Sequence, residues 1–570
     1  MKKSIRYAII AIIVIAIGAT LAYSYSNSLI NNYFLDTNNK GANQKSLSSF
    51  TAPKQTSTSS ASSNSTVEQT VQKDKQHVCG DNITGSTFYM TEYVVPISCS
   101  QPVGLTVDKN NNIWVAADWA GYLLVFNPVS NTFVKSIKLP NWNSTDLFGS
   151  MIWDMKFDKN GSLWFTDERS NSIWKYLPKE NQFQRYIVPT KGGYPISLVF
   201  DSNGKVWFTE IFGKKLAMLD PLKVKSNTTK GISELNLSKQ INFDSTGPIS
   251  NGFGFNQNVR GNNTNSSIAD ENLWFSTVNF PIGGQLVKYN IAKKNLTVFD
   301  LTNRHTIPLS VAEDEKGRVW TNDHASSLFL VLDPSNGNIK QYSTSFALPT
   351  NTTTLPYYNE YRDGKVWFNE HYGNAIAFFN VKNNTLVEYH IPTKDPFWGN
   401  ASNPLRFVFD NNGSVWFTEW TENKIGVLHK EKMNDLPITI STSKDSMILD
   451  KNLGKGDTVD ILIYKNNSNA LINNGNKSST NPSSLQHSNI TMFATSSISK
   501  IGSLTNLTSS FKPDRFLLTN DNMTNSIQPL KTVFEIKPSK DVTPGNYTLT
   551  ISARYNNEIT YSKIIDLDIR

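Results

Sequence analysis

The sequence predicts an all-β chain built around a seven-bladed β-propeller. The first observation is a repeat, in which an aliphatic-Trp pair follows a turn rich in Gly, Asn and Asp seven times. The second is the pattern within each repeat of about fifty residues, where alternating apolar runs separated by Asn-Gly and Asp-Gly turns indicate four antiparallel strands. The repeated tryptophans are Trp114, Trp164, Trp207, Trp274, Trp320, Trp367 and Trp416.

The ends of the repeat region predict how the propeller closes. The seventh repeat supplies three strands, and the segment "STFYMTEYVVP" from Ser86 resembles the fourth strand "NTLVEYHIP" from Asn384. We therefore expect the N-terminal strand to complete the last blade, which leaves no open sheet edge. Cys79 and Cys99 flank this strand and are the only cysteines. Outside the cytosol such a pair is expected to form a disulfide, which would hold the closing strand.

Export is predicted by the first residues of the chain. Positive charges precede an apolar run from Tyr7 to Ala22, which predicts that the chain after this run is exported. Residues 1–23 are either a signal anchor or a signal peptide cleaved after Ala22. We favour the anchor, because residues 24–75 form a Ser/Thr-rich segment that cannot bury a core and is typical of a disordered stalk. The expected location is the outer side of the cell membrane, or the medium if the leader is cleaved.

The propeller is assigned to residues 76–435, and the repeat pattern ends there. Residues 436–570 hold short strand-like runs and a polar loop, which favour an immunoglobulin-like β-sandwich acting as a spacer or as a contact module for other cell-surface proteins. The net charge of +8 over 570 residues is mild and spread out, so we expect no nucleic-acid partner. Asn-x-Ser/Thr sequons such as Asn64 and Asn351 fit an exported glycoprotein, or simply an Asn-rich composition.

The repeated units follow, with departures at single positions, the form Pro-x-Gly-Ile, then Asp-Gly-x-Trp-Phe-Thr-Glu, then Asn-x-Ile-Gly. Examples are "QPVGLTVDKNNNIWVAAD" from Gln101 and "NPLRFVFDNNGSVWFTEWTENKIGVL" from Asn403. Over residues 86–430 the chain thereby resembles virginiamycin B lyase and its streptogramin lyase relatives. The resemblance implies a propeller fold and a carbon-oxygen lyase that opens the lactone ring of a cyclic depsipeptide antibiotic, with a magnesium ion and a His base. In that family the key His residues follow the Pro that begins the inner strand of the last two blades, and a Glu precedes the last of those prolines.

This sequence departs from the family pattern at the catalytic positions. Tyr357 follows Pro356 in the sixth repeat, and Asn403 and Leu405 flank Pro404 in the seventh. A Leu cannot accept a proton, and a Tyr with an ordinary pKa near 10 is a poor base at neutral pH. The sequence therefore favours a binding module for a small molecule, glycan or peptide over an active lyase.

Acidic residues end most of the Trp strands, and topology predicts that they converge with the residues after each Pro on one face around the axis. Such a face is the default ligand site. A ring of carboxylates would suit Mg²⁺ or Ca²⁺, which prefer oxygen ligands, although a residue repeated in every blade can also serve the fold alone. The series is Asp167, Glu210, Asp323, Glu370 and Glu419, with Asp118 one place later in the first repeat; the candidate metal ligands are Glu210, Asp323, Glu370 and Glu419.

Residues that break the repeat are the further candidates. His324 and His371 each follow one of these acids in neighbouring blades and are a candidate metal-binding or acid/base pair, with Tyr357 as a third candidate catalytic residue; the alternative is exposed loop histidines. Arg406 would bind a carboxylate or phosphate of a ligand, or else pair with a ring carboxylate. The other candidate ligand-binding residues are Trp153, Asp154, Tyr358 and Trp420.

Three functions remain open from the sequence. The first is the cell-surface binding module. The second is a metal-dependent lyase or lactone-opening enzyme acting on cyclic esters, with His324 or His371 as base. The third is a structural surface-coat or adhesion protein that makes its contacts through the C-terminal sandwich.

Overall fold

The computed structural model describes residues 80–142, 150–241, 254–255, 271–277, 283–301, 307–345, 353–395, 401–466, 488–518 and 528–570. The chain divides into two compact units, Met1–Val78 and Cys79–Arg570, and the described residues belong to the second. The expected anchor and stalk lie outside the described residues. Within the described ranges, no helix combines the length and the apolar character that crossing a membrane requires.

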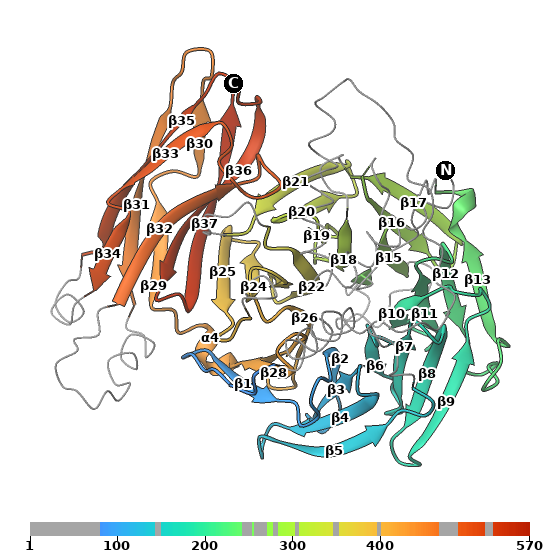
Figure 1. Ribbon diagram of the computed structural model, residues 1–570. Coiled ribbons are helices and arrows are strands. Elements are labelled where there is room, and N and C mark those ends of the chain that lie inside the picture. Colours follow the sequence, from blue (N-terminus) through green and yellow to red (C-terminus); the bar gives the residue numbers. More distant parts are fainter. Residues whose placement is uncertain are drawn as a thin grey trace, which may run out of the picture. The chain divides into compact units, whose positions relative to one another are not determined.

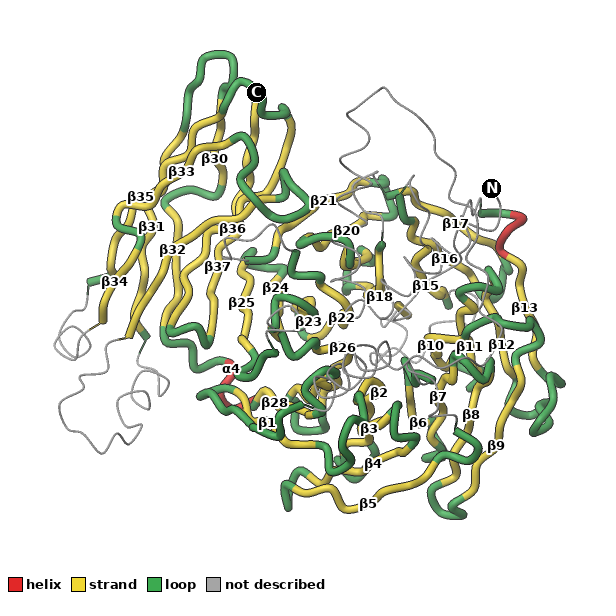
Figure 2. The backbone as a smooth tube through the Cα atoms, in the orientation of Figure 1, coloured by secondary structure: helices red, strands yellow, loops and turns green. Residues whose placement is uncertain are grey.

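The chain is all-β and consists mainly of antiparallel sheets (Figures 1 and 2). Every repeated Trp lies on the second strand of a sheet. We number these sheets one to seven in chain order. Sheets one to three are β2 (Pro102–Val107), β3 (Ile113–Ala117), β4 (Tyr122–Asn127) and β5 (Thr132–Lys138); β6 (Met155–Phe157), β7 (Leu163–Asp167), β8 (Ser172–Leu177) and β9 (Gln182–Ile187); and β10 (Pro195–Phe200), β11 (Val206–Glu210), β12 (Lys215–Leu219) and β13 (Ile232–Asn236). Sheets four to six are β14 (Gly254–Phe255), β15 (Asn272–Thr277), β16 (Gln285–Asn290) and β17 (Asn295–Asp300); β18 (Pro308–Glu313), β19 (Val319–Asp323), β20 (Leu328–Asp333) and β21 (Asn338–Ser343); and β22 (Pro356–Arg362), β23 (Lys365–Glu370), β24 (Ala375–Asn380) and β25 (Thr385–His390).

An aspartate placed six residues before the Trp builds the turn between the first two strands. In sheet three, Asp201 accepts the backbone N–H groups of Asn203 at 3.0 Å and Lys205 at 2.9 Å through Oδ1. Its Oδ2 accepts the indole N–H of Trp207 at 2.9 Å. One carboxylate therefore closes the turn and orients the Trp, which is why the repeated turn and the repeated Trp occur together. The same indole bond is made by Trp114, Trp164, Trp320 and Trp416.

The hydrophobic core lies between neighbouring sheets. Trp207 of sheet three packs with Leu273 and Phe275 of sheet four, and Trp416 of sheet seven packs with Ile113 of sheet one. The first strands also contact one another, β2 with β6 and β18 with β22. This succession of four-stranded sheets, each packed on the next, is a propeller-like arrangement.

The predicted pairing of the N-terminal strand is confirmed. Strand β1 (Met90–Val94) pairs with β28 (Lys424–Leu428), next to β27 (Val415–Glu419) and β26 (Pro404–Phe409). Sheet seven is therefore completed by a segment from the other end of the repeat region. The expected disulfide stays a prediction, because Cys79 lies outside the described residues.

The chain after sheet seven passes through a short helix, α4 (Lys430–Met433), into two further sheets, which we call the C-terminal sheets. One contains β29 (Ile438–Thr442), β31 (Asp457–Lys465), β35 (Leu530–Pro538) and β33 (Leu507–Lys512). The other contains β34 (Arg515–Leu518), β32 (Ser488–Ser496), β36 (Gly545–Tyr555), β37 (Ile559–Ile569) and β30 (Ser446–Leu449). Apolar side chains of both sheets, including Ile461, Phe534 and Ile551, meet in one core.

Sheet six continues into the C-terminal sheets. Strand β25 pairs antiparallel with β37, which places Glu388 opposite Thr560 and joins the strands of both parts into one nine-stranded sheet (Figure 1). Residues 76–435 and 436–570, expected to be separate domains, therefore share a sheet.

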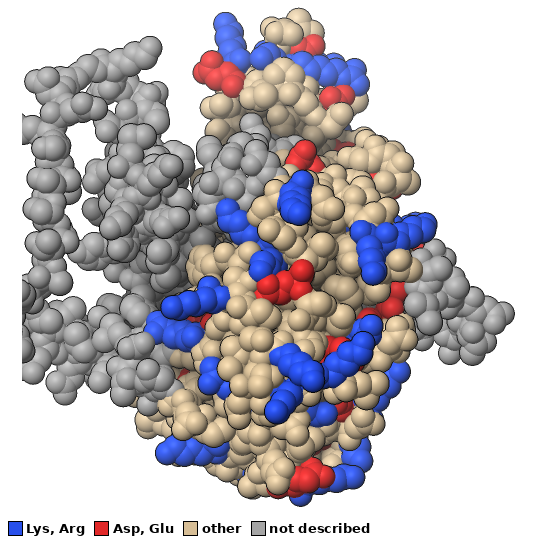
Figure 3. All heavy atoms as spheres, turned by 90° about the vertical axis from the view of Figure 1, so that its right-hand side faces the viewer, with Lys and Arg blue, Asp and Glu red and all other residues tan. Residues whose placement is uncertain are grey.

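The surface agrees with a mild and dispersed charge. Figure 3 shows Lys and Arg side chains scattered over one face, with Asp and Glu side chains between them. No continuous basic area is visible on this face.

Candidate functional site

His324 and His371 lie side by side, as the sequence predicts. They directly follow the last residues of β19 and β23, and their rings stack with centroids 5.4 Å apart and planes 9° from parallel. Tyr357, the second residue of β22, meets both rings edge-on, with centroids 4.8 Å from His324 and 6.0 Å from His371. The three candidate catalytic residues therefore form one aromatic cluster.

Backbone hydrogen bonds fix the residues that follow the Trp strands. The N–H of His324 donates to the carbonyl of Ile307 at 2.9 Å, and the N–H of His371 donates to that of Leu355 at 3.0 Å. Ile307 and Leu355 precede the prolines that begin the first strands of the same sheets. In both sheets this bond ties the residue after the Trp strand to the residue before the first strand of the same sheet, which fixes the backbone at His324 and His371.

Burial makes both histidines neutral at neutral pH. His324 is 3% exposed and His371 is 2% exposed, so the alternative of exposed loop histidines does not hold. Burial lowers the pKa of His324 to about 4, against a weaker opposing effect of nearby carbonyls and Asp323. Burial and the adjacent His324 ring lower the pKa of His371 well below its ordinary value, while Asn403 opposes this. Among the residues that the structure describes, none of the four ring nitrogens has a partner at hydrogen-bonding geometry.

The position four residues after each Trp carries two acids as well as the two histidines. Asp118 and Glu168 occupy it in sheets one and two, and both are buried. The indole N–H of Trp153 donates to Glu168 Oε2 at 2.6 Å. Burial raises the pKa of Glu168 to about 7, and burial followed by the nearby carboxylates raises the pKa of Asp118 well above its ordinary value.

Glu168 is absent from the sequence-based candidates, although a signal for it exists. Counting four residues from the repeated Trp leads from Trp320 to His324 and, by the same count, from Trp164 to Glu168. The same position holds Trp420 in sheet seven and Ile211 in sheet three, and both are buried. This set of residues at position four, with Tyr357 and Trp153 beside it, is the candidate functional site.

The candidate metal ligands do not form one group. Glu210, Asp323, Glu370 and Glu419 belong to four different sheets, and no three His, Cys, Asp or Glu side chains in the described part of the chain are placed to hold a metal ion. Asp323 accepts the backbone N–H of Ile307 at 3.2 Å, within its own sheet. A metal role for these acids, with Mg²⁺ or Ca²⁺, stays a prediction.

The glutamates that end the Trp strands fold back onto their own turns. A Cβ added at Gly193 would lie 2.6 Å from Glu210 Oε2, and one added at Gly213 would also collide with it, so these glycines leave the room that the carboxyl occupies. Gly373 does the same for Glu370. Burial raises the pKa of Glu210 to about 8 and that of Glu370 well above its ordinary value.

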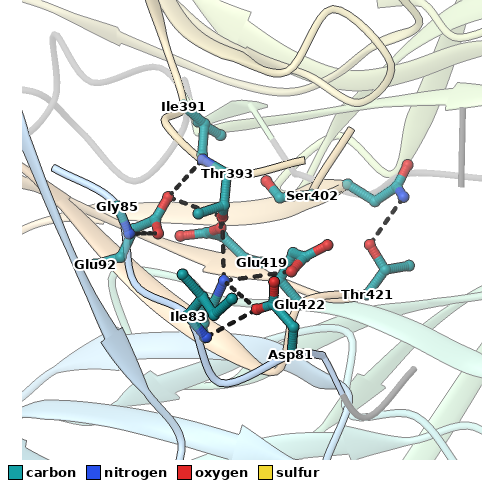
Figure 4. Close-up of polar contacts among 12 residues, drawn as sticks. Asp81, Ile83, Gly85, Glu92, Ile391, Thr393, Ser402, Glu419, Thr421 and Glu422 are labelled. Atoms are coloured by element: carbon teal, nitrogen blue, oxygen red, sulfur yellow. Dashed lines mark hydrogen bonds and ion pairs between the residues drawn. The ribbon is translucent and has the colours of Figure 1, made fainter. Parts of the chain in front are cut away.

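In sheet seven the corresponding glutamate joins a buried polar cluster around the closing strand (Figure 4). Glu92 of β1 accepts the N–H groups of Gly85 at 2.6 Å and Thr393 at 3.0 Å. The Thr393 hydroxyl donates to both Glu92 and Glu419, at 3.0 and 3.3 Å. Lys424 Nζ lies 3.3 Å from Glu422 Oε2. These contacts hold β1 in place, so Glu419 serves the closure of this sheet.

The candidate ligand-binding residues fall into two groups. Trp153 and Trp420 belong to the candidate site described above. Arg406 lies over the ring of Tyr358, 4.6 Å from its centroid. Burial raises the pKa of Tyr358, and the charge of Asp154 acts in the same direction. Arg406 and Tyr358 lie on the first strands of sheets seven and six, and Asp154 directly precedes β6, the first strand of sheet two. These three residues therefore form a second polar cluster.

Comparison with known proteins leaves the family open. No family model matches the sequence, and no curated protein matches it. A streptogramin B lyase structure is similar with a TM-score of 0.46 and 23% identity, over 60% of this chain and 97% of that one. Virginiamycin B lyase from Staphylococcus aureus gives 0.45 and 20%, over 59% and 98%. The extracellular domain of a putative one component system from B. thetaiotaomicron gives 0.42 and 14%, over 83% and 57%. These values are too low to assign a family or an activity.

Proposed function

We propose that this chain is a cell-surface binding module, and that its ligand site is formed by the residues four places after the repeated tryptophans. Its scaffold is a closed seven-bladed β-propeller joined to an immunoglobulin-like sandwich. The packing of Trp416 on sheet one and the pairing of β1 with β28 support a closed ring. The N-terminal sequence supports export with a membrane anchor.

The observation that carries the proposal is the pair of buried histidines. Buried polar atoms nearly always have hydrogen-bond partners, and an unsatisfied one is costly. The ring nitrogens of His324 and His371 make no hydrogen bond of good geometry among the described residues. The nearby backbone of Leu355 and Pro356 and the side chain of Asn403 have only weak effects on them. The two rings lie together. Such a place is suited to a ligand that supplies the missing partners.

The protonation state of the site selects the ligand class. A neutral imidazole offers one donor and one acceptor, and two of them beside Tyr357 suit groups that both donate and accept. Hydroxyl groups of a sugar and amide groups of a peptide have this property, and aromatic side chains such as Trp420 add apolar contact. We therefore propose a neutral polar ligand, a glycan or peptide.

The lyase alternative has less support. A general base works best with a pKa near the working pH, and His324, with a pKa of about 4, is a weak base at neutral pH. The candidate metal ligands also lie in separate sheets.

A titration followed at the histidines would test the proposal. The full chain, with labelled histidine, would be titrated with panels of neutral oligosaccharides and peptides, and in parallel with Mg²⁺, Ca²⁺ and Mn²⁺. We expect a saturable sugar or peptide signal at His324 and His371 that is lost in the His324→Phe and His371→Phe variants. Saturable cation binding that is lost in the same variants would favour the enzyme instead. A ligand that binds both variants normally would overturn this site.

A further inference from the structure

Three sheets share a pair of glutamates, a buried one at the end of the Trp strand and one on the fourth strand, which is buried in sheets six and seven and half-buried in sheet three. In each pair the two carboxyl groups affect one another's protonation, as like charges do at close range. The pKa of the glutamate at the end of each Trp strand is raised, so this carboxyl group holds a proton at neutral pH. The charge that remains on its partner is costly to bury unless a cation lies nearby. The pairs are Glu210 with Glu234, Glu370 with Glu388, and Glu419 with Glu92.

In sheet three a lysine supplies the balancing charge. Lys215 begins the third strand, directly opposite Glu210 in the strand register. Its Nζ contacts the carboxylate of Glu234 and the hydroxyl of Thr190. Thr190 itself donates its N–H to Glu234 at 2.8 Å. The result is a compact unit of two acids, one Thr and one Lys.

Sheet seven repeats this unit with the closing strand (Figure 4). Lys424 begins the third strand opposite Glu419, and its side chain is fully buried. Its Nζ lies 3.3 Å from the hydroxyl of Thr393, the residue that also donates to Glu92. The lysine position is therefore the same in both sheets.

Sheet six has the acids and the hydroxyl but not the lysine. The N–H of Ser345 donates to Glu388 at 2.8 Å, and the Ser345 hydroxyl donates to the same carboxylate. The residue opposite Glu370 in the register is Ala375, which carries no charge. This sheet therefore lacks an internal cation at the position where sheets three and seven have one.

The C-terminal sheets bring an arginine to the same row of the continuous sheet. Glu388 is opposite Thr560, and Thr560 is opposite Arg554, so the three side chains share one face. The Thr560 hydroxyl accepts from Arg554 Nε at 3.4 Å and contacts His390 Nε2 at 2.8 Å. The positive charge of Arg554 acts on Glu388 and Glu370 at longer range than the direct ion pair of Lys215 with Glu234.

We propose that Arg554 takes the place of the missing lysine, and that this charge directs the docking of the C-terminal sheets onto sheet six. The negative charge of the acid pair in sheet six is then balanced only when β37 pairs with β25. Docking also closes the edge of β25, which would otherwise offer unpaired backbone groups. The C-terminal sheets are thus a required part of the propeller-like body and not a detachable spacer.

Charge removal with rescue would test this role in the full chain. Arg554→Met keeps a long stem over the Phe493 ring, whose centroid lies 5.0 Å from the guanidinium, but removes the charge. We expect the melting temperature to fall by several degrees, with faster proteolysis between α4 and β29. Adding Ala375→Lys should recover most of the melting temperature. The matched control is Lys215→Met in sheet three, which should lower the melting temperature without speeding cleavage between α4 and β29.

If the Ala375→Lys variant does not fold, a double-mutant cycle between Arg554 and Glu388 tests the proposal instead. Glu388→Gln removes one of the acids. In this background Arg554→Met should lower the melting temperature clearly less than it does in the wild-type chain. Equal losses in both backgrounds would show that Arg554 does not act through the acid pair. An Arg554→Met variant that melts and is cleaved like the wild type would equally overturn the proposal.

Discussion

Replacing His324 by Phe should change how the stability of the chain depends on pH. The aromatic ring beside His371 and Tyr357 is kept, and only the titrating group is lost. At neutral pH the folded chain holds His324 as a neutral, buried imidazole. In the unfolded wild-type chain this imidazole binds a proton at its ordinary pKa, so lowering the pH stabilises the unfolded state. The variant has no group that binds a proton at this position, so its unfolded state is not stabilised in this way.

The size of the effect follows from the pKa. The folded pKa of about 4 lies below the ordinary value of 6.5, so the wild type loses stability as the pH falls from 6.5 towards 4. One pKa unit is worth about 1.4 kcal/mol, which brings the total loss to about 3 kcal/mol. At pH 7.5 and above this contribution should be constant.

Two measurements check this prediction. Denaturation of wild type and His324→Phe at several values between pH 7.5 and 4.5 should show the variant gaining relative to the wild type as the pH falls. Labelled-histidine NMR should show that the His324 ring stays neutral near pH 5, as should the rings of His371 and His390, whose pKa values burial also lowers. The chain has only 7 His to assign. A constant difference between the two chains, or a His324 that titrates near pH 6.5, would refute the burial argument.

Three further predictions concern the scaffold. Asp201→Ala should lower the free energy of unfolding by about 2–4 kcal/mol, because it leaves the buried Trp207 indole without its acceptor. Asp201→Asn should lower it by about half as much, and chemical denaturation would measure both losses. Glu210, with a pKa of about 8, should contribute stability that is full below pH 4.5 and is lost as the pH rises to about 8, so the melting temperature of Glu210→Gln should fall less than that of the wild type across this range. Deleting residues 436–570 should expose β25 and cause self-association, detectable by light scattering; a stable monomer would contradict the edge argument.

The sheets could be predicted because their information is local. The carboxylate of Asp201 forms the turn and holds Trp207 within seven residues of sequence, so a reader of the chain sees the turn, the Trp and the strand together. The meeting of His324 with His371 was predictable for a related reason. Each follows the end of an equivalent strand, and neighbouring sheets place equivalent positions side by side.

The continuation of sheet six into the C-terminal sheets could not be predicted in this way. Strand β25 is buried along most of its length, whereas the fourth strands β5, β13 and β17 are largely exposed or half-buried. In sequence all four are short mixed runs of apolar and polar residues. What distinguishes β25 is its partner β37, which comes from a distant part of the chain, and no local pattern encodes that pairing.

The acidic series is predicted to converge on one face, which stays a prediction, whereas the surroundings of each carboxyl group are set by packing within its own sheet. Glu210 and Glu370 have a glycine three residues later, and the carboxyl group fills the space beside that glycine. Repeating this arrangement from sheet to sheet stabilises each sheet separately. Within the described residues it brings no three acidic or His side chains together as a metal-binding group.

The contrast between neighbouring positions is the strongest argument about function. Position three after the Trp is acidic in most sheets and serves its own sheet, whereas position four changes from Asp118 and Glu168 to His324, His371 and Trp420. A ligand is not symmetric, so the position that varies from sheet to sheet is the one able to recognise it. We therefore expect substitutions at position four to change binding at small cost in melting temperature, and substitutions of Glu210 or Glu419 to lower the melting temperature with little effect on affinity. Affinity that follows the acidic series instead would move the site to position three.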